Sequence, residues 1–147
     1  MKLKIAWVGK TKDSAIQALT DDYVKRLHNY AEVEAVPVKD ESTLLKFCAR
    51  DARPTRHTLV LLDGAGKQLS SEELAKFLRD HKERNPLPLL FAIGPADGFT
   101  DEARKAAGLV LSLSKMTLPH ELARIILLEQ LYRAFTILKG HPYHLGH

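Results

Sequence analysis

Cysteine is almost absent from this chain of 147 residues, since Cys48 is the only one. A single cysteine cannot form a disulfide within the chain, so the fold needs no cross-link and suits a reducing compartment. Cys48 follows the apolar residues Leu44, Leu45 and Phe47. Packing is therefore favoured over catalysis for this thiol, because nothing around it in the sequence would activate it.

Long apolar runs are also missing. None reaches the roughly 18 residues that a membrane-spanning helix needs. The first residues, MKLKIAWVGK, have neither a long apolar core nor a small-residue cleavage site, so we expect no signal peptide. A composition of 45% hydrophobic and 27% charged residues excludes a disordered chain. We therefore expect one globular domain in the cytoplasm, with no membrane partner.

The common phosphate-binding signatures are absent too. The stretch DGAGK at 63–67 has Leu61 where a Walker loop has its first glycine, and Gln68 where it has Ser or Thr. Residues 93–98 lack the Gly-x-Gly-x-x-Gly pattern of dinucleotide sites and can be read as a turn. ATP, GTP and dinucleotide chemistry are thus not indicated, which counts against a small-molecule enzyme of flavodoxin-like build.

The net charge is +4, and the two ends of the chain lean basic. Residues 1–56 carry 11 Lys and Arg against 8 Asp and Glu, and residues 101–147 carry 6 against 4. A face built from both ends could attract phosphates, whereas a merely solvated surface is the simpler interpretation.

Apolar periodicity predicts five strands alternating with five helices. The predicted strands are Lys2–Val8, Val33–Val38, Thr58–Leu62, Leu87–Ile93 and Leu109–Leu111. The predicted helices run from Asp13 or Ser14 to about His28, from Ser42 to about Arg50, from the Ser70–Glu73 capping box through Leu78, from Thr100, and from Pro119 as first helical residue to about Leu138, with Gly140 as C-terminal cap. This order predicts an α/β fold with a mainly parallel sheet flanked by helices.

Three loops follow predicted inner strands, after Leu62, Ile93 and Leu111. Ligands of parallel sheets bind beyond the carboxyl ends of the strands, so these loops mark a candidate site. The loop Leu113–Leu118 is apolar but contains two hydroxyl residues and a lysine. Its backbone could hydrogen-bond an adenine while leucine and methionine side chains enclose the ring, or the loop could simply pack.

The C-terminal residues HPYHLGH are rich in imidazole. The spacing of His141, His144 and His147 could suggest zinc, but no cysteine or acidic residue lies nearby in the sequence, so we expect no metal. A frayed tail is one alternative. A tail that contacts bases or moves protons is the other, because Tyr and His stack on bases and His titrates near neutral pH.

The stretches LSLSKMTLPHELAR and LLEQLYRAFTILKGHPYH closely resemble the C-terminal half of the ribosomal RNA large subunit methyltransferase H (RlmH) family, and MKLKIAWVGK and the short length fit it too. The resemblance implies one SPOUT domain over 1–147, with a deep trefoil knot over approximately 58–147. It also implies a homodimer that binds S-adenosylmethionine (SAM). The implied reaction is methylation of N3 of a pseudouridine in the helix-69 loop of 23S rRNA, within the assembled ribosome.

The resemblance also implies site residues. The implied cofactor contacts are Leu62, Gly94, Leu113, Ser114, Lys115, Met116, Thr117 and Leu118. The candidate catalytic residues are Arg133, His141, Tyr143 and His144, with Arg133 holding an imide anion or a phosphate and His144 slightly favoured as general base. Pro95 stands where the family usually has a second glycine, which removes a backbone donor. Another RNA target such as tRNA, and a non-catalytic RNA-binding or ribosome-associated module, remain alternatives.

Overall fold

The computed structural model describes residues 1–145, in which five strands alternate with five helices as the sequence predicts. The strands are β1 (Lys2–Val8), β2 (Glu32–Val38), β3 (Thr58–Gln68), β4 (Leu89–Ile93) and β5 (Leu109–Ser112). The helices are α1 (Ser14–Leu27), α2 (Glu41–Lys46), α3 (Ser71–Arg84), α4 (Asp101–Ala106) and α5 (His120–Leu138).

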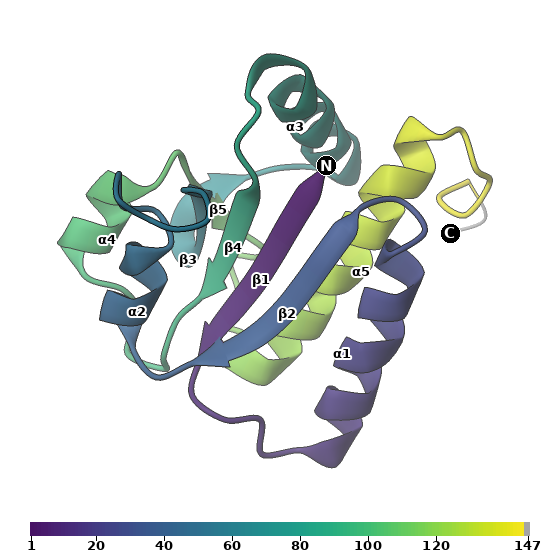
Figure 1. The fold of residues 1–147 in the computed structure, drawn as a ribbon. Coiled ribbons are helices and arrows are strands. Elements are labelled where there is room, and N and C mark those ends of the chain that lie inside the picture. Colours follow the sequence, from purple (N-terminus) through teal and green to yellow (C-terminus); the bar gives the residue numbers. More distant parts are fainter. Residues whose placement is uncertain (146–147) are drawn as a thin grey trace.

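The strands form one sheet in the order β2-β1-β4-β3-β5, and every pair is parallel. The predicted parallel sheet is therefore confirmed. Because all strands run the same way, their carboxyl ends meet at one edge, the lower edge in Figure 1. The chain inserts β4 between β1 and β3, so the loops after β3 and β4 leave this edge side by side.

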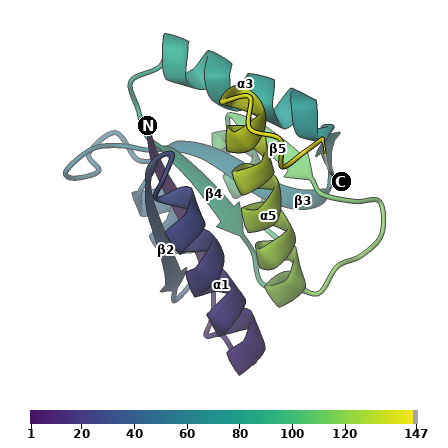
Figure 2. The same cartoon turned by 90° about the vertical axis from the view of Figure 1, so that its right-hand side faces the viewer.

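Helices cover both faces of the sheet (Figures 1 and 2). α1, α3 and α5 pack on one face, where Ile5, Phe91 and Leu128 belong to the larger core cluster. α2 and α4 pack on the other face through Leu44 and Ala103. All five residues of β4 are buried, which explains its unbroken apolar sequence.

Local capping explains where most helices begin and end. The Asp13 carboxylate accepts the Ala15 N–H at the start of α1, and Ser70 and Glu73 form the predicted capping box of α3. Gly140 has a φ of 70° just after α5, as expected for a C-terminal cap. Pro119 differs from the prediction, because its ψ of 139° is extended and α5 begins one residue later, without a side-chain cap.

Other boundaries differ from the sequence prediction as well. α2 ends at Lys46 rather than Arg50, because the N–H groups of the next two residues bond to carbonyls three residues back and tighten the turn. β4 begins at Leu89 rather than Leu87, because Pro88 has no N–H to give to a ladder. β3 continues to Gln68, but residues 63–66 leave its ladder with β5 in a bulge.

The bulge brings the backbone of β3 at Gly66 close to the backbone of β5 at Val110. A Cβ at Gly66 would lie 2.6 Å from the Val110 carbonyl oxygen, so only glycine fits. Among residues 1–145, no helix is long and apolar enough to cross a membrane.

Candidate functional site

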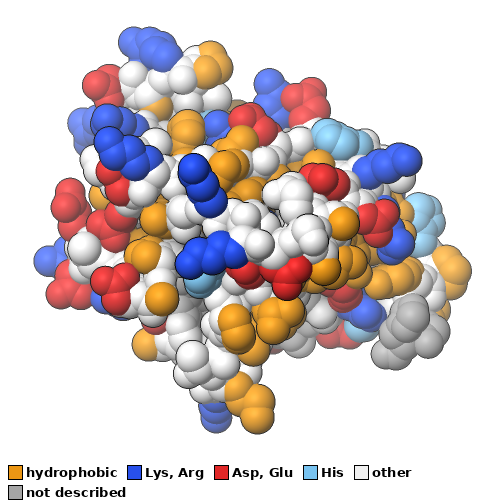
Figure 3. Space-filling model, turned by 90° about the horizontal axis from the view of Figure 1, so that it is seen from below, with side chains coloured by type: hydrophobic (Ala, Val, Ile, Leu, Met, Phe, Trp, Pro, Cys, Tyr) orange, Lys and Arg blue, Asp and Glu red, His pale blue; other side chains and the backbone are white. Residues whose placement is uncertain are grey.

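A cavity of about 620 Å³ opens at the carboxyl edge of the sheet. Its walls come from the three loops that follow β3, β4 and β5, together with the start of α5. The lining residues fall in 62–65, 93–99, 111 and 113–118, with Arg104, His120 and Ala123. Figure 3 looks onto this edge of the molecule, where apolar side chains lie beside acidic and basic ones.

Every residue expected to contact a cofactor lines this cavity. These residues are Leu62, Gly94, Leu113, Ser114, Lys115, Met116, Thr117 and Leu118. The three strand ends therefore come together as the parallel sheet requires. That these residues hold a cofactor stays a prediction.

The loop after β5 has a backbone fixed by its own hydroxyl groups. Ser112 is buried, and its hydroxyl donates to the Ser114 carbonyl over 3.0 Å. The Met116 N–H donates in turn to Ser114 Oγ over 2.9 Å. Met116 lines the cavity as well but is 78% exposed, so most of its surface faces solvent. Leu113 and Leu118 are half-buried and form the apolar part of this wall.

The loop after β4 packs tightly under the cavity. The buried Phe99 ring lies against Gly94, where an added Cβ would be only 2.8 Å from the ring. The Gly98 N–H donates to the Pro95 carbonyl over 2.9 Å and closes a turn, with a φ of 85° at Gly98. Pro95 thus serves as an acceptor in the turn and offers no N–H to a ligand.

An ion pair that the sequence did not reveal stands at the cavity wall. Arg104 donates from Nη2 and Nε to Asp63 Oδ2, over 2.6 and 3.1 Å, and both residues line the cavity. The Ala65 N–H, followed by Arg104, holds the pKa of Asp63 below its usual value. The only sequence signal was an acidic residue directly after a strand, because its partner lies 41 residues away.

The candidate catalytic residues gather at the other end of α5. Arg133 donates to both oxygens of Glu129, and its guanidinium carbon lies 4.9 Å from the centre of the Tyr143 ring. Burial raises the pKa of Tyr143. The Tyr143 ring also meets Tyr132 edge-on at 5.0 Å. His144 lies between Arg133 and Glu72 of α3. The distance from Arg133 Nη1 to His144 Nδ1 is 3.0 Å.

The contacts of His144 define its tautomer. Arg133 can only donate, so Nδ1 of His144 must accept. The proton is then on Nε2, which donates to Glu72 Oε1 over 2.7 Å. Glu72 has a pKa held below its usual value by its own backbone N–H and then by His144. In this arrangement the lone pair on Nδ1 of His144 already accepts the Arg133 N–H, so it is not free to accept another proton.

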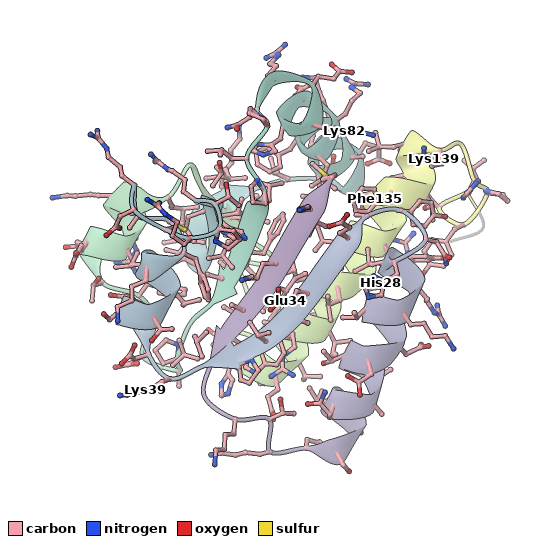
Figure 4. The ribbon with its side chains drawn as sticks, in the orientation of Figure 1. His28, Glu34, Lys39, Lys82, Phe135 and Lys139 are labelled. Atoms are coloured by element: carbon pink, nitrogen blue, oxygen red, sulfur yellow. The ribbon has the colours of Figure 1, made fainter. Side chains whose placement is uncertain are left out.

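His141 contacts a different set of residues. Its Nδ1 lies 2.7 Å from the Tyr30 hydroxyl, and Tyr30 stacks in turn on Phe135, with ring centres 5.8 Å apart. Figure 4 labels Phe135 on α5, beside the start of β2. The tail is therefore held by side-chain contacts at His141, Tyr143 and His144, whereas Leu145 is 88% exposed. His147 lies outside the described residues, and residues 1–145 contain no group of three His, Cys, Asp or Glu suited to a metal.

Cavity and tail are far apart within one chain. His120 lines the cavity, and Arg133 follows it by 13 residues on the same helix, which corresponds to about 20 Å along the axis. One chain alone therefore does not bring the two sets of predicted residues together.

Comparisons with known proteins agree over the full length. A family model described as "Predicted SPOUT methyltransferase" matches residues 1–144. The chain is 56% identical to the ribosomal RNA large subunit methyltransferase H of Koribacter versatilis, with 100% of both chains covered. It is 43% identical to the protein of that name from Gloeobacter violaceus, over 99% of this chain and 100% of the relative.

A solved structure shares the fold. The SpoU methyltransferase AviRb from Streptomyces viridochromogenes, in complex with the cofactor AdoMet, superposes with a TM-score of 0.54 at 16% identity. The match covers 88% of this chain and 56% of that protein. At this identity the likeness establishes a common fold only.

Proposed function

The chain belongs to the SPOUT methyltransferase family, and from this premise we propose that it transfers a methyl group from SAM to large-subunit ribosomal RNA. The observation that carries the proposal is the cavity at the carboxyl edge, formed by three strand-end loops. The relatives named ribosomal RNA large subunit methyltransferase H, matched over full length, support RNA as the substrate.

The residues around the cavity fit such a cofactor. A volume of about 620 Å³ lies in the range of small-molecule sites. Leu62, Leu113 and Leu118 offer apolar walls for a flat ring, and the hydroxyl-braced backbone after β5 offers fixed polar groups. Gly94 lets backbone approach a ligand closely. When bound, SAM supplies an electrophilic methyl group on a sulfonium.

The proposed acceptor is N3 of a pseudouridine in the helix-69 loop of 23S rRNA, within the assembled ribosome of the cytoplasm. This nitrogen carries a proton and is a poor nucleophile until the proton leaves. The Arg133 guanidinium would stabilise the resulting imide anion or hold a phosphate. Tyr143 and His141 would hold the base. His144 can accept the proton at Nδ1 only after the Arg133 N–H turns away from it.

A homodimer would close the gap between cavity and tail. Leu122 and Ile126 are 49% and 37% exposed on α5, and Leu19 of α1 is 42% exposed, so two adjacent helices leave apolar side chains open. In an antiparallel pairing of two α5 helices centred near Ile126, His120 and Arg133 each lie about 10 Å from the centre, on opposite sides. Arg133 of the partner subunit would then stand beside the cavity.

The single domain over 1–147 and the knot over approximately 58–147 belong to the same proposal. The match of the SPOUT methyltransferase family model to residues 1–144 is what supports the knot. The loop 113–118 would then lie within the knotted part and hold the cofactor.

The test is mass analysis of large-subunit rRNA nucleosides from a deletion strain, with primer extension across the helix-69 loop. Loss of one methylated pseudouridine, restored by the purified protein and SAM on ribosomes, is expected. A methyl group lost from tRNA instead would contradict the rRNA target. No calorimetric signal at millimolar SAM would favour a non-catalytic module and contradict the enzymatic function altogether.

A further inference from the structure

A compact basic loop begins at the last residue of α2. It comprises residues 46–57 and is called the basic loop below. The His57 N–H donates to the Phe47 carbonyl over 2.8 Å, which holds the two ends of the loop together. Within it, the Ala52 N–H donates to the Ala49 carbonyl, and Arg53 Nη1 donates to the Asp51 carbonyl over 3.2 Å. Compact loops with joined ends are frequently functional.

The base of the basic loop is packed against the sheet. The rings of Phe47 and His57 meet edge-on, with centres 6.0 Å apart. Lys4 of β1 places its Nζ 4.0 Å from the centre of the Phe47 ring. Burial, and then Lys4, lowers the pKa of His57, so the imidazole at the base stays neutral near pH 7. The loop is thus a built feature rather than a loose connection.

The charge of the chain is concentrated here. Lys46, Arg50, Arg53 and Arg56 are all exposed, and Asp51 is the one acidic residue, so the basic loop carries +3 of the chain's net +4. In the described part of the chain, none of the four cations forms an ion pair with a carboxylate. The side chains are therefore available to an anionic partner.

The basic loop lies apart from the rest of the proposed machinery. It follows α2, which packs on the sheet face opposite α1, α3 and α5 (Figure 1). It ends at the amino edge of the sheet, where the Thr58 N–H donates to the Pro88 carbonyl. The cavity opens at the carboxyl edge. A dimer formed through α5 would leave the basic loop of each subunit on the outside.

We propose that the basic loop binds the phosphate backbone of ribosomal RNA outside the methylated loop, an inference that rests on the proposed function. Guanidinium groups match phosphate oxygens in a bidentate geometry, and three of the four cations are arginines. Phosphate contacts give affinity and orientation without reading the base sequence. A small domain with a single base pocket has few other contacts that would supply this affinity and orientation. No large apolar side chain in residues 46–57 is strongly exposed, which disfavours a membrane surface.

The test compares two triple variants with equal loss of charge. The loop variant is Arg50→Gln/Arg53→Gln/Arg56→Gln. The control is Arg79→Gln/Lys82→Gln/Arg84→Gln, which removes three exposed cations of α3. The measurements are the SAM dissociation constant, kcat and KM on purified large subunits and whole ribosomes, and retention of a duplex RNA at several salt concentrations.

For the loop variant we expect KM for the ribosomal substrate to rise about tenfold, with kcat at saturation and SAM affinity unchanged. The slope of its plot of log affinity against log salt should become shallower by about 2.7, because each of the three lost phosphate contacts contributes about 0.9. The control should stay within about twofold of the wild type. A loop variant that behaves like the control in KM and in salt slope would overturn the proposal.

The proposed function can fail separately. If the wild-type protein does not methylate ribosomal RNA, that function is wrong, and the basic loop is judged from duplex RNA retention alone. Loss of retention in the loop variant only would still support RNA binding. Loss of binding to phosphatidylserine vesicles with unchanged RNA retention would instead assign the loop to membranes and overturn the inference.

Discussion

The Arg124 guanidinium lies over the indole of Trp7, with its central carbon 3.6 Å from the ring centre, although the arginine is only 1% exposed. Nη1 donates to the hydroxyls of Thr11 and Thr20, over 2.9 and 3.2 Å. No carboxylate within residues 1–145 forms an ion pair with it, and burial lowers its pKa. The pair therefore joins α5 to β1 and α1 through ring contact and hydroxyl bonds.

Loss of the ring should cost more than loss of the charge. Trp7→Ala leaves a void and an unsupported buried cation, so we expect the free energy of unfolding to fall by about 3–5 kcal/mol. Arg124→Met keeps the volume and removes a buried charge that lacks an ionic partner, so we expect a change under about 1 kcal/mol. Urea unfolding of both variants checks this, and equal losses would contradict it.

The close packing at Gly94 can be tested by substituting Gly94, with Gly64 as the control position. Gly94→Ala would place a Cβ 2.8 Å from the buried Phe99 ring, so the ring or the loop after β4, both at the cavity wall, must shift. We expect SAM affinity to fall at least about tenfold, roughly 1.4 kcal/mol. Gly64→Ala, at another lining position where an added Cβ meets nothing within 4 Å, should bind SAM like the wild type. Calorimetry measures both, and equal affinities would exclude a cofactor contact at Gly94.

The tail residues should matter for transfer and not for cofactor binding. Arg133→Ala or His144→Ala removes groups about 20 Å along α5 from the cavity of the same chain. We expect methyl transfer to be lost while SAM affinity stays nearly intact. Rates on ribosomes and calorimetry with SAM separate the two quantities. Full activity in both variants would remove these residues from the mechanism.

A mixing experiment decides which subunit's tail serves which cavity. Gly94→Val, which forces a branched side chain against the Phe99 ring at the cavity wall, and Arg133→Ala, which removes the tail function, should each be inactive alone. If the tail acts across the dimer, a mixed dimer has one intact composite site, and statistical mixing restores about a quarter of wild-type activity. Unfolding and remixing the two variants tests this. No recovery, with mixed dimers demonstrated by mass, would place tail and cavity in one subunit.

The Cys48 thiol should resist alkylation at ordinary pH. Burial raises its pKa to about 11, with Arg56 acting weakly in the other direction. Between about pH 8.5 and 11 the folded protein therefore keeps the thiol proton that the unfolded chain has lost. The contribution of this group to the free energy of unfolding is fully present below the unfolded pKa of about 8.5. Stability should fall as the pH rises from there toward 11. Alkylation rates against pH, with and without urea, check the shift, and a native midpoint near 8.5 would contradict it.

Much of the fold follows from local patterns. The apolar run of β4 and the capping box at Ser70 were visible in the sequence, and both are confirmed. The cavity was predictable as well, because a parallel sheet brings its strand ends to one edge. The end of α2 was not, since Phe47 and Cys48 continue a helical spacing and yet form a tightened turn.

Long-range side-chain pairs were beyond sequence reasoning. Asp63 meets Arg104, and His144 meets Glu72, only because strand order and helix packing bring distant segments together. The periodicity of a single chain does not specify that order. The basic excess at the C-terminal end was equally deceptive, because Arg124 is buried and Arg133 is ion-paired.

The edge strand β2 bears on how the protein behaves at high concentration. An open strand edge can recruit another chain and start fibrous aggregation. β2 carries the exposed carboxylates of Glu32 and Glu34, the second labelled in Figure 4, and each pairs with a lysine of β1. Pro37, near the end of the strand, has no N–H to donate to a strand of another molecule. The charged side chains and the proline of β2 thus disfavour edge-to-edge strand pairing between molecules at high protein concentration.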